Sequence, residues 1–432
     1  MTARTLADWL AFIEAQHPKT IAMGLERARA VADAMALPRP ARRVVTVGGT
    51  NGKGSTVAFV EAIARAAGWK VGVYTSPHLL RYNERVRIDG AEADDATLIA
   101  AFEAVEAARA AMPGGAVPLT YFEFGTLAAL WLFARSGPAS GPLDLAVLEV
   151  GLGGRLDTVN IVDPDVAVVT TVDLDHQEWL GDTIEAIGAE KAGIARAWKP
   201  LVLGDDDPPS SVLGHAYAIG ASAIRIGCDF FFERIDDNRW RWRELGCELE
   251  LPVPTLVAPV QLRNAAVAIA ALRALPEDLP EAAFAEGVRT ARPAARLQRF
   301  EREGVEIVVD VGHNPQAARA LAQWLDAAPT DGPTHAVFAA LGDKDVVGVV
   351  EALAGRIDRW WLAGLADAGP RGLATDAFAA RLAGTSAATG TPCATVAEAL
   401  AAARRDTPRG GRILVFGSFH TAAAALAALG DG

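Results

Sequence analysis

The chain has 432 residues, of which 51% are hydrophobic and 22% charged, which is typical of a globular protein with more than one domain. Its net charge of −12, without a dense run of Lys or Arg, argues against a nucleic-acid partner, and no uninterrupted apolar stretch is long enough to span a membrane. Three widely separated cysteines, Cys228, Cys247 and Cys393, are typical of reduced thiols in a cytoplasmic protein and not of disulfides or a zinc site.

The N-terminal part of the chain predicts a helix followed by an α/β domain. Residues 1–18 form an amphipathic pattern that contains Asp8 and Glu14 and lacks the apolar core of a signal peptide. Short β-branched runs then alternate with alanine-rich helical stretches, which predicts parallel strands joined by crossover helices. The expected strands are residues 43–47, 71–74, 145–149, 166–172 and 201–203.

The pattern changes twice further along the chain. Residues 230–253 alternate polar and apolar side chains around Asp237 and Asn238, which predicts an antiparallel hairpin. Residues 290–300, with a proline and several arginines, are interpreted as a linker. Strands are expected again at residues 306–311, 336–340, 360–363 and 413–416. We therefore predict an α/β protein with a large domain at residues 1–293 and a smaller one at residues 294–432.

A glycine-rich turn follows the first of these strands. In "VVTVGGTNGKGSTVAFVEAI", residues 44–63, an apolar strand leads into the turn, then a lysine, then a helical pattern. Such a turn can point its amides inward, and the start of the helix favours anions. Lys53 would add positive charge for phosphates, and Ser55 or Thr56 a hydroxyl for Mg²⁺. The spacing departs from G-x-x-x-x-G-K-[ST] by one residue, Gly54, so a simple turn with a solvated lysine is the alternative.

Three further residues follow later strand or helix patterns. Glu149 ends an apolar strand, His176 lies just past the next one, and Lys191 lies in a helical stretch. Each alone has an ordinary structural interpretation. Because ligand-binding residues in open α/β sheets gather at the carboxyl ends of the strands, together they indicate a metal site beside bound phosphates.

Motifs along nearly the whole chain complete the pattern: "GTNGKGS", "TSPHL", "TYFEF", "EVGLGGRLD", "DHQEWLG", "EKAGI", "DVGHNP" and "GSFH". In this order they resemble the folylpolyglutamate synthase/dihydrofolate synthase family, which belongs to the Mur ligase superfamily. In that family an extra glycine after the lysine, as at Gly54, is the normal form of the loop. The resemblance implies an N-terminal P-loop ATPase domain with a mostly parallel sheet, a smaller Rossmann-like C-terminal domain, and an active site between them.

The resemblance also implies an activity. The expected enzyme is a cytoplasmic, monomeric ligase that uses ATP to add L-glutamate to dihydropteroate and to reduced folates through an acyl phosphate. The residues implied for ATP binding are Asn51, Gly52, Lys53, Gly54, Ser55, Thr56, Asn264, Arg296 and Asp310. Those implied for two Mg²⁺ sites are Ser55, Ser76, Glu149, His176 and Lys191, the last carrying an N6-carboxylate. The catalytic set would be Lys53, Lys191 and His313.

The substrate sites are implied in the same way. The pterin or folate residues would be Gly24, Leu25, Glu26, Arg27, Thr120, Tyr121, Phe122, Glu123, Leu156, Asp157 and Thr158. His313 and Ser418 would contact the incoming glutamate. The family usually has alanine at the position of Thr158, which leaves the local contact open. "DVGHNP" replaces the more usual "DGAHNP" but keeps Asp310, His313 and Asn314.

Several alternatives remain at this point. Another Mur ligase would share the chemistry, but those enzymes typically carry an extra N-terminal domain, and Lys53 comes too early in the chain to leave room for one. A nucleotide-dependent binding module would lack glutamate-dependent ATP turnover. A folate-binding protein that has lost catalysis fits poorly with Lys53, Glu149, His176 and Lys191 all being present. A polyglutamylase without the dihydropteroate activity is the nearest variant within the family.

Overall fold

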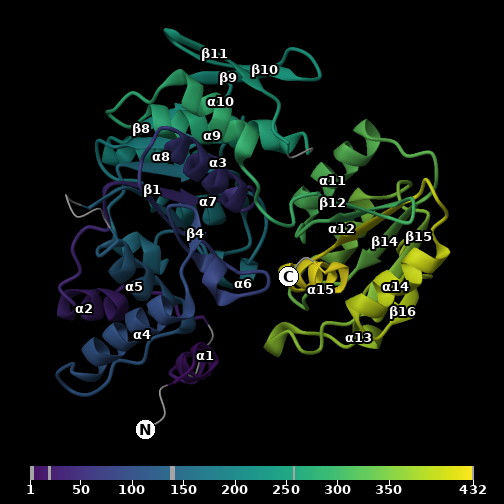
Figure 1. Ribbon diagram of the computed structural model, residues 1–432, viewed down its shortest axis with the longest axis horizontal. Helices are drawn as coiled ribbons and strands as arrows, with labels where there is room; N and C mark the ends of the chain where they lie inside the picture. The colour runs from purple at the N-terminus through teal and green to yellow at the C-terminus, as the bar shows by residue number, and fades with distance from the viewer. Residues whose placement is uncertain (1–3, 18–20, 137–141, 256–257, 431–432) are drawn as a thin grey trace. The chain divides into compact units, whose positions relative to one another are not determined.

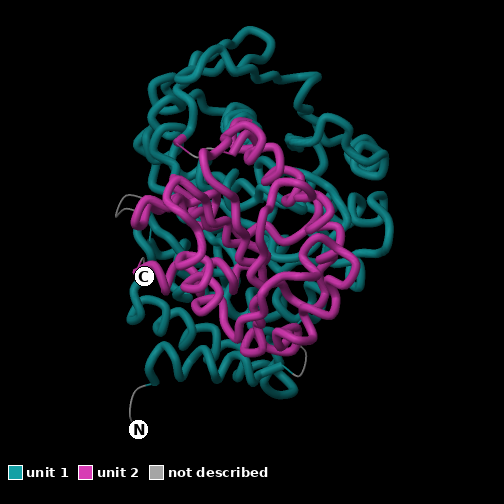
Figure 2. The backbone as a smooth tube through the Cα atoms, turned by 90° about the vertical axis from the view of Figure 1, so that its right-hand side faces the viewer, with its two compact units in different colours: residues 1–254, 263–291 teal, residues 255–262, 292–432 magenta. Residues whose placement is uncertain are grey.

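A computed structural model describes residues 4–17, 21–136, 142–255 and 258–430. The chain divides into two compact units, which are described separately (Figure 2). The first unit comprises residues 1–254 and 263–291, and the second comprises residues 255–262 and 292–432. The domain limits predicted from the sequence, at residues 293 and 294, stay a prediction. No helix in the described ranges is long and apolar enough to cross a membrane.

The first unit is built on an eight-stranded sheet with the order β4-β3-β2-β5-β1-β6-β7-β8. Its strands are β1 (Ala41–Gly48), β2 (Val71–Tyr74), β3 (Val86–Ile88), β4 (Ala91–Glu92), β5 (Leu143–Glu149), β6 (Val166–Val169), β7 (Pro200–Leu203) and β8 (Ser222–Arg225). Six strands, in the sheet order β2-β5-β1-β6-β7-β8, run parallel to one another. β3 and β4 add an antiparallel edge beside β2. The parallel sheet that the alternating pattern predicted is confirmed. Its central strands are buried nearly throughout, as expected of a sheet with helices on both faces.

Helices surround this sheet (Figure 1). They are α1 (Leu6–Glu14), α2 (Glu26–Ala34), α3 (Lys53–Ala66), α4 (Asp95–Ala110), α5 (Tyr121–Phe133), α6 (Gln177–Leu180), α7 (Ile184–Ala192), α8 (Ser210–Ile219), α9 (Val260–Arg273, whose first residues fall in the second unit) and α10 (Glu281–Thr290), with short 3₁₀ helices η1 (Tyr82–Arg85) and η2 (Thr158–Ile161). The amphipathic N-terminal helix is present as α1, closed by a capping box between Thr5 and Asp8.

Two of these helices, α3 and α10, approach each other very closely. A Cβ atom added at Gly287 in α10 would lie 2.4 Å from Ile63 Cα in α3, so only hydrogen fits at that position. The contact holds α3, the helix that begins at Lys53, against a second helix at its far end.

Residues 230–252 form a separate three-stranded antiparallel sheet with the order β11-β10-β9. Its strands are β9 (Phe230–Arg234), β10 (Arg239–Glu244) and β11 (Cys247–Pro252). The hairpin predicted around Asp237 and Asn238 joins β9 to β10, and a second turn at Gly246, with φ +79°, adds a third strand that the sequence analysis missed. Trp240 and Trp242 are buried on one face of this sheet.

The second unit contains a six-stranded sheet with the order β12-β13-β17-β14-β15-β16. Its strands are β12 (Gln298–Arg302), β13 (Val305–Val309), β14 (Thr334–Phe338), β15 (Arg359–Ala363), β16 (Thr391–Cys393) and β17 (Arg412–Phe416). Its helices are α11 (Pro315–Ala327), α12 (Val346–Ala352), η3 (Gly369–Arg371), α13 (Thr375–Ala380), α14 (Val396–Asp406) and α15 (Phe419–Leu429). All strands except β12 run parallel.

Several strand boundaries differ by a few residues from the expected ones, and two of these differences have a clear physical reason. β6 ends at Val169 and not at residue 172, because Thr170 and Thr171 turn their side chains to another part of the chain. The expected linker at residues 290–300 ends in strand β12, which begins at Gln298 and pairs antiparallel with β13. The sequence of β12 is strongly charged, so its pairing partner, more than its own pattern, makes it a strand.

Candidate active site

The glycine-rich turn connects the central strand β1 to helix α3. Gly49 and Gly52 both have positive φ angles, +137° and +89°. A Cβ atom at Gly49 would lie 2.0 Å from Thr170 Oγ1, and one at Gly52 would lie 2.7 Å from Asn264 Oδ1. The turn therefore requires glycine at both positions for its conformation and for close packing. It also brings Asn264, a predicted ATP ligand far along the chain, against the loop.

Lys53 is the first residue of α3, and its side chain turns back over the loop. Its Nζ donates hydrogen bonds to the carbonyl oxygens of Gly49 at 2.9 Å and Thr50 at 3.1 Å. A positive charge is thus held beside the N-terminus of a 14-residue helix, where the peptide dipoles also favour an anion. This is the arrangement that binds phosphate groups.

The hydroxyls of Ser55 and Thr56 are in different surroundings. Both residues are buried, and the Thr56 Oγ1 atom is shut off from solvent and has no hydrogen-bond partner among the described residues. A group that no ligand can reach is a poor candidate for binding a metal. Ser55 is therefore the better candidate of the two hydroxyls that the sequence analysis left open.

Two neighbouring parallel strands bring Glu149 and Ser76 together. Glu149 ends β5 and is buried, and Ser76 follows the end of the adjacent strand β2. The backbone N–H of Ser76 donates to Glu149 Oε2 at 3.3 Å. The Glu149 carboxylate and the Ser76 backbone thus meet at the carboxyl edge of the sheet, where ligand-binding groups of open α/β sheets gather.

Lys191 and Asp157 are buried ionisable groups near Lys53. Burial, together with the positive charge of Lys53, lowers the pKa of Lys191 to about 7. Burial raises the pKa of Asp157 to about 7, against the opposing effect of backbone N–H donors and of Lys53. Each of these groups acts on the others, so the structure brings the three residues into one electrostatic cluster.

His176 caps the short helix α6 with a left-handed backbone, φ +53°. Its Nε2 lies 3.9 Å from Asp175 Oδ1, and its backbone N–H donates to the same oxygen at 2.9 Å. Among the residues that the structure describes, no three His, Cys, Asp or Glu side chains form a metal site by themselves. A cation here would need hydroxyls, a modified lysine or phosphate oxygens to complete its ligands.

The residues predicted to contact the pterin are partly engaged with one another. Arg27 forms an ion pair with the buried Glu123 at 2.9 Å, and Glu123 also closes a capping box with Thr120 at the start of α5. Burial raises the pKa of Tyr121 to about 12. Phe122 packs so closely that a Cβ at Gly151 would lie 2.8 Å from its ring. These contacts are those of a packed core.

The loops of the predicted pterin site do meet. The Gly24 N–H donates to the Leu156 carbonyl at 3.4 Å, which joins the segment of Leu25 and Glu26 to the segment of Asp157 and Thr158. Asp157 accepts from the N–H groups of residues 152 and 159 at 2.8 and 3.0 Å, and Thr158 is buried beside it.

In the second unit, the predicted residues gather at the carboxyl ends of β13 and β17, which are adjacent parallel strands. Asp310 is buried and accepts hydrogen bonds from the N–H groups of Leu297 at 2.9 Å and Gly312 at 2.7 Å. Burial raises the pKa of Asp310, and the charge of Arg296 partly opposes this. His313 Nδ1 lies 2.9 Å from the Val311 carbonyl oxygen.

Arg296 and Ser418 have further contacts within this unit. The Arg296 guanidinium lies 5.4 Å from the centre of the Phe419 ring. Ser418 is the N-cap of α15, where its hydroxyl accepts from the Thr421 N–H and lies 2.7 Å from Thr421 Oγ1. The Ser418 hydroxyl therefore has a structural role as a helix cap.

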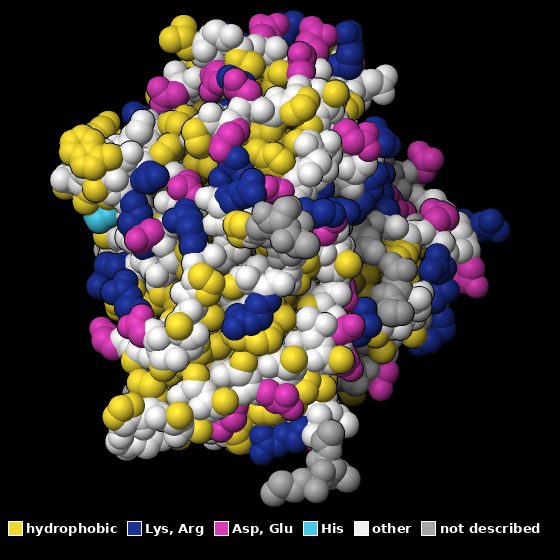
Figure 3. All heavy atoms as spheres, turned by 60° about the vertical axis from the view of Figure 1, so that its left-hand side comes forward, with side chains coloured by type: hydrophobic (Ala, Val, Ile, Leu, Met, Phe, Trp, Pro, Cys, Tyr) yellow, Lys and Arg dark blue, Asp and Glu magenta, His cyan; other side chains and the backbone are white. Residues whose placement is uncertain are grey.

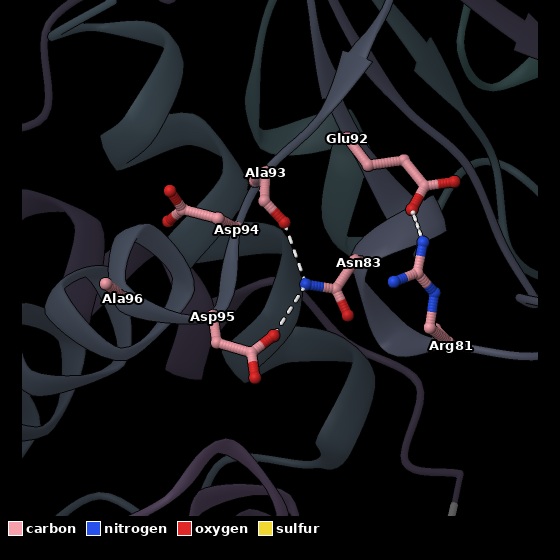
Figure 4. Close-up of a pocket in the computed structure, with 7 residues that line it drawn as sticks. All are labelled: Arg81, Asn83, Glu92, Ala93, Asp94, Asp95 and Ala96. Atoms are coloured by element: carbon pink, nitrogen blue, oxygen red, sulfur yellow. Dashed lines mark hydrogen bonds and ion pairs between the residues drawn. The ribbon is translucent and has the colours of Figure 1, made fainter.

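A surface hollow lies elsewhere in the first unit, beside β4 and the start of α4 (Figure 4). Asn83 Nδ2 donates to the Ala93 carbonyl and to Asp95, and Arg81 pairs with Glu92. The residues that line it are not among the predicted site residues, and these polar groups are partnered within the fold.

On the face shown in Figure 3, Lys and Arg are interspersed with Asp and Glu.

Sequence analysis missed one group of residues at this site. Thr50 lies in the loop, and its hydroxyl bonds to the backbone of Asp173. Thr170 and Thr171 follow β6, and their hydroxyls bond to the loop backbone at Asn51. The only feature of the sequence that pointed to Thr170 and Thr171 was a pair of threonines at the end of an apolar run, inside the strand expected at residues 166–172.

The chain is similar to known proteins both in sequence and in structure. Residues 295–419 match the family described as "Mur ligase, glutamate ligase domain". The chain is 43% identical over 422 residues to the dihydrofolate synthase/folylpolyglutamate synthase of Escherichia coli (strain K12), covering 98% of this chain and 94% of that protein. A solved structure of E. coli FolC in complex with DHPP and ADP superposes with a TM-score of 0.91 at 42% identity, covering 99% of this chain and 98% of that one.

A second solved structure adds ligands. A bifunctional folylpolyglutamate synthase/dihydrofolate synthase with Mn, AMPPNP and L-glutamate bound matches with a TM-score of 0.89 and 42% identity, over 99% of this chain and 98% of that one. Relatives of this chain therefore bind an adenine nucleotide and a divalent metal.

Proposed function

This chain belongs to the dihydrofolate synthase/folylpolyglutamate synthase family of the Mur ligases, and from that premise we propose how its residues carry out the reaction. It is an ATP-dependent ligase that adds L-glutamate to dihydropteroate and to reduced folates. The observation that carries this conclusion is similarity along the whole chain, 43% identity over 98% of its length, with a glycine-rich phosphate loop at the expected place.

The ligation proceeds in two steps. A carboxylate oxygen of the pterin substrate attacks the γ-phosphorus of ATP, the bond to ADP breaks, and an acyl phosphate forms. The α-amine of glutamate then attacks the acyl carbon, phosphate leaves with the electron pair of the C–O bond, and the amine loses a proton. The protein supplies no nucleophile, so it acts by positioning the reactants, stabilising charge and excluding water.

The phosphate groups would bind at the loop of residues 49–52 and the N-terminus of α3. Supporting this are the two left-handed glycines, the helix dipole and the Lys53 ammonium held over the loop. Asn264, which lies against Gly52, would contact the nucleotide beside the loop.

Two metal positions are part of the proposal. Ser55, Ser76 and Glu149 would hold one cation, and His176 and Lys191 the other. The contact of Ser76 with Glu149 and the enclosed position of the Thr56 hydroxyl support the first set. Mg²⁺, when bound, offsets the negative charge of the triphosphate and so allows a carboxylate to approach it.

Lys191 would carry an N6-carboxylate. With a pKa of about 7, about half of its side chains are neutral amines at pH 7, against about one in three thousand at the ordinary pKa. The neutral Nζ can attack the carbon of carbon dioxide. A C–N bond forms, one C=O electron pair moves to oxygen, and a proton is released. The product is a buried anion suited to a divalent cation, where a buried ammonium would be repelled.

The remaining assignments are also proposals. Arg296 and Asp310 would contact the nucleotide, and His313 and Ser418 the incoming glutamate. The loops of residues 24–27, 120–123 and 156–158 would bind the pterin, with Phe122 as its aromatic contact. We further propose a monomeric, cytoplasmic enzyme, in keeping with three free cysteines.

The test is an assay of purified protein with Mg-ATP, L-glutamate and either dihydropteroate or tetrahydrofolate. ADP release should require both the pterin substrate and glutamate, and the product should gain one glutamate by mass. ADP release that continues without glutamate would contradict ligation. Turnover with tetrahydrofolate but not with dihydropteroate would identify the protein as a polyglutamylase that lacks the dihydropteroate activity.

A further inference from the structure

We propose that three threonines, Thr50, Thr170 and Thr171, form a hydroxyl brace that positions the nucleotide loop and joins it to the segment that carries His176. The three are positioning residues, since none is required to touch the nucleotide. The inference rests on the proposed binding of ATP at this loop, and it adds residues to which neither the motifs nor the family resemblance gave a role.

The first half of the brace fixes Asn51, at the turn of the loop. The carbonyl oxygen of Asn51 accepts from Thr170 Oγ1 at 2.6 Å and from Thr171 Oγ1 at 3.2 Å. The Asn51 N–H in turn donates to Thr171 Oγ1 at 3.0 Å. A loop carbonyl without a partner in a strand or helix needs a donor from elsewhere in the fold. The two hydroxyls provide it from a segment about 120 residues away.

The second half joins the loop to the segment before His176. Thr50 Oγ1 donates to the Asp173 carbonyl at 3.1 Å and accepts from the Asp173 N–H at 3.0 Å. The Thr50 N–H also donates to the Thr171 carbonyl at 2.7 Å. Asp173 lies three residues before His176, so a shift of the loop is transmitted to the backbone that sets the position of His176.

Asp205 anchors the same segment from the opposite side. It follows β7, the strand next to β6, and its Oδ2 accepts from the Val172 N–H at 2.7 Å. Residues 170–173 are thus held by the nucleotide loop on one side and by the end of β7 on the other.

Gly49 shows how closely the two parts approach. A Cβ there would lie 2.0 Å from Thr170 Oγ1 and 3.0 Å from the Thr170 backbone nitrogen. The glycine therefore serves the contact with Thr170 as well as the turn itself. Without the hydroxyl bonds, the loop would keep its sequence but lose the restraint that preforms it for phosphate.

The experiment removes two of the three hydroxyls, one at a time, and measures nucleotide binding. Thr171→Val and Thr50→Val keep the side-chain shape and delete the bonds. Thr46→Val, in the same strand–loop unit, is the matched control, because Thr46 Oγ1 is buried without a hydrogen-bond partner among the described residues. Dissociation constants for ADP with and without Mg²⁺ are measured by calorimetry, and the melting temperature of each variant is recorded.

The brace predicts that Thr171→Val weakens Mg-ADP binding about tenfold, the effect of losing one to two ordinary hydrogen bonds. Thr171→Ser should restore most of the affinity, and Thr46→Val should change nothing. Thr50→Val should also reduce the gain in ADP affinity that Mg²⁺ produces, because His176 is displaced. A purely structural role would lower the melting temperature and leave this Mg²⁺ gain as in the wild type.

The outcomes separate the two proposals. If the wild type binds no adenine nucleotide, the proposed function fails. If the wild type binds Mg-ADP and ligates glutamate, but folded Thr171→Val and Thr50→Val bind it as tightly as Thr46→Val, the brace is wrong and the function stands. If Thr171→Val does not fold, Thr171→Ser and Thr50→Val decide the same question.

Discussion

Two parts of the first unit carry the predicted ligand residues, and they use their polar groups in different ways. At the nucleotide loop, neutral hydroxyls from residues 170–171 hold the loop backbone, and the charge of Lys53 is held beside it by carbonyl oxygens. At the predicted pterin surface the charged groups hold each other, as Arg27 and Glu123 do. Because neutral hydroxyls hold the loop, the positive charge of Lys53 can act on a ligand. The charges of Arg27 and Glu123 neutralise each other and mainly stabilise the fold.

The largest expected effect tests the loop side of this comparison. Lys53→Ala should lower kcat by about a thousandfold or more, since it removes the charge that offsets the transferring phosphate, while the melting temperature stays near that of the wild type. Lys70→Ala is the control, because Lys70 is an exposed lysine paired with Asp89. Turnover retained in Lys53→Ala would remove Lys53 from the assigned role.

The next effect tests the pterin side. Glu123→Ala leaves the partly buried Arg27 without its carboxylate partner and removes one half of the capping box of α5, so unfolding in urea should show a loss of about 3 kcal/mol. The exposed pair of Arg81 and Glu92 is the matched control, and Glu92→Ala should cost less than about 1 kcal/mol. Equal losses of unfolding free energy in Glu123→Ala and Glu92→Ala would contradict the structural role of the pair at the pterin surface. An effect of Glu123→Ala on ADP affinity would contradict the separation of this pair from the nucleotide loop.

A pH dependence sharpens the comparison at Lys191. Its pKa is about 7 in the folded protein against 10.5 in its ordinary state. Below pH 7 both states are protonated; between pH 7 and 10.5 only the unfolded state keeps the proton, so stability rises with pH there. In carbon-dioxide-free buffer without metal, the wild type should gain about 1 kcal/mol per pH unit relative to Lys191→Met between pH 7 and 9. Parallel stability curves for the two proteins would show that Lys191 is not perturbed.

The smallest effect concerns Thr158, where the family usually has alanine. Thr158→Ala should change the KM for dihydropteroate by less than about threefold, because Asp157 is held by backbone N–H groups that the substitution leaves in place. Steady-state kinetics with dihydropteroate as the varied substrate measure this. A tenfold rise in KM would instead make Thr158 a substrate contact.

Much of the fold was predictable from the sequence, because long elements carry their own pattern. The parallel strands and the helix after the glycine-rich turn follow from runs of apolar residues and from glycine placement. The strands β3, β4, β8, β11, β12 and β16 were missed. They lie at sheet edges or next to them, where pairing with a neighbour, and not an apolar run, makes the strand. The transfer of residues 255–262 to the second unit has no marker in the sequence either.

The candidate site was predictable to a different degree. Lys53, Glu149 and Lys191 stand out because a charge at the end of an apolar strand, or in the helix beside it, is unusual in a core. Thr170 and Thr171 do not stand out, because their partner, Asn51, is about 120 residues away in the chain and the bonds exist only once the sheet has formed. Glu123 was expected at the pterin, and its ion pair with Arg27 appears only in the folded chain.

The contact at Gly287 restricts which substitutions this sequence can accept during evolution. Its hydrogen lies where any side chain would strike the backbone of Ile63 in α3, the helix whose first turn carries Lys53. Even alanine there would have to displace that helix or bend it. A position with no ligand, no charge and no polar atom is thereby tied to the chemistry at the far end of α3, and descendants of this chain can exchange it only together with changes that move the two helices apart.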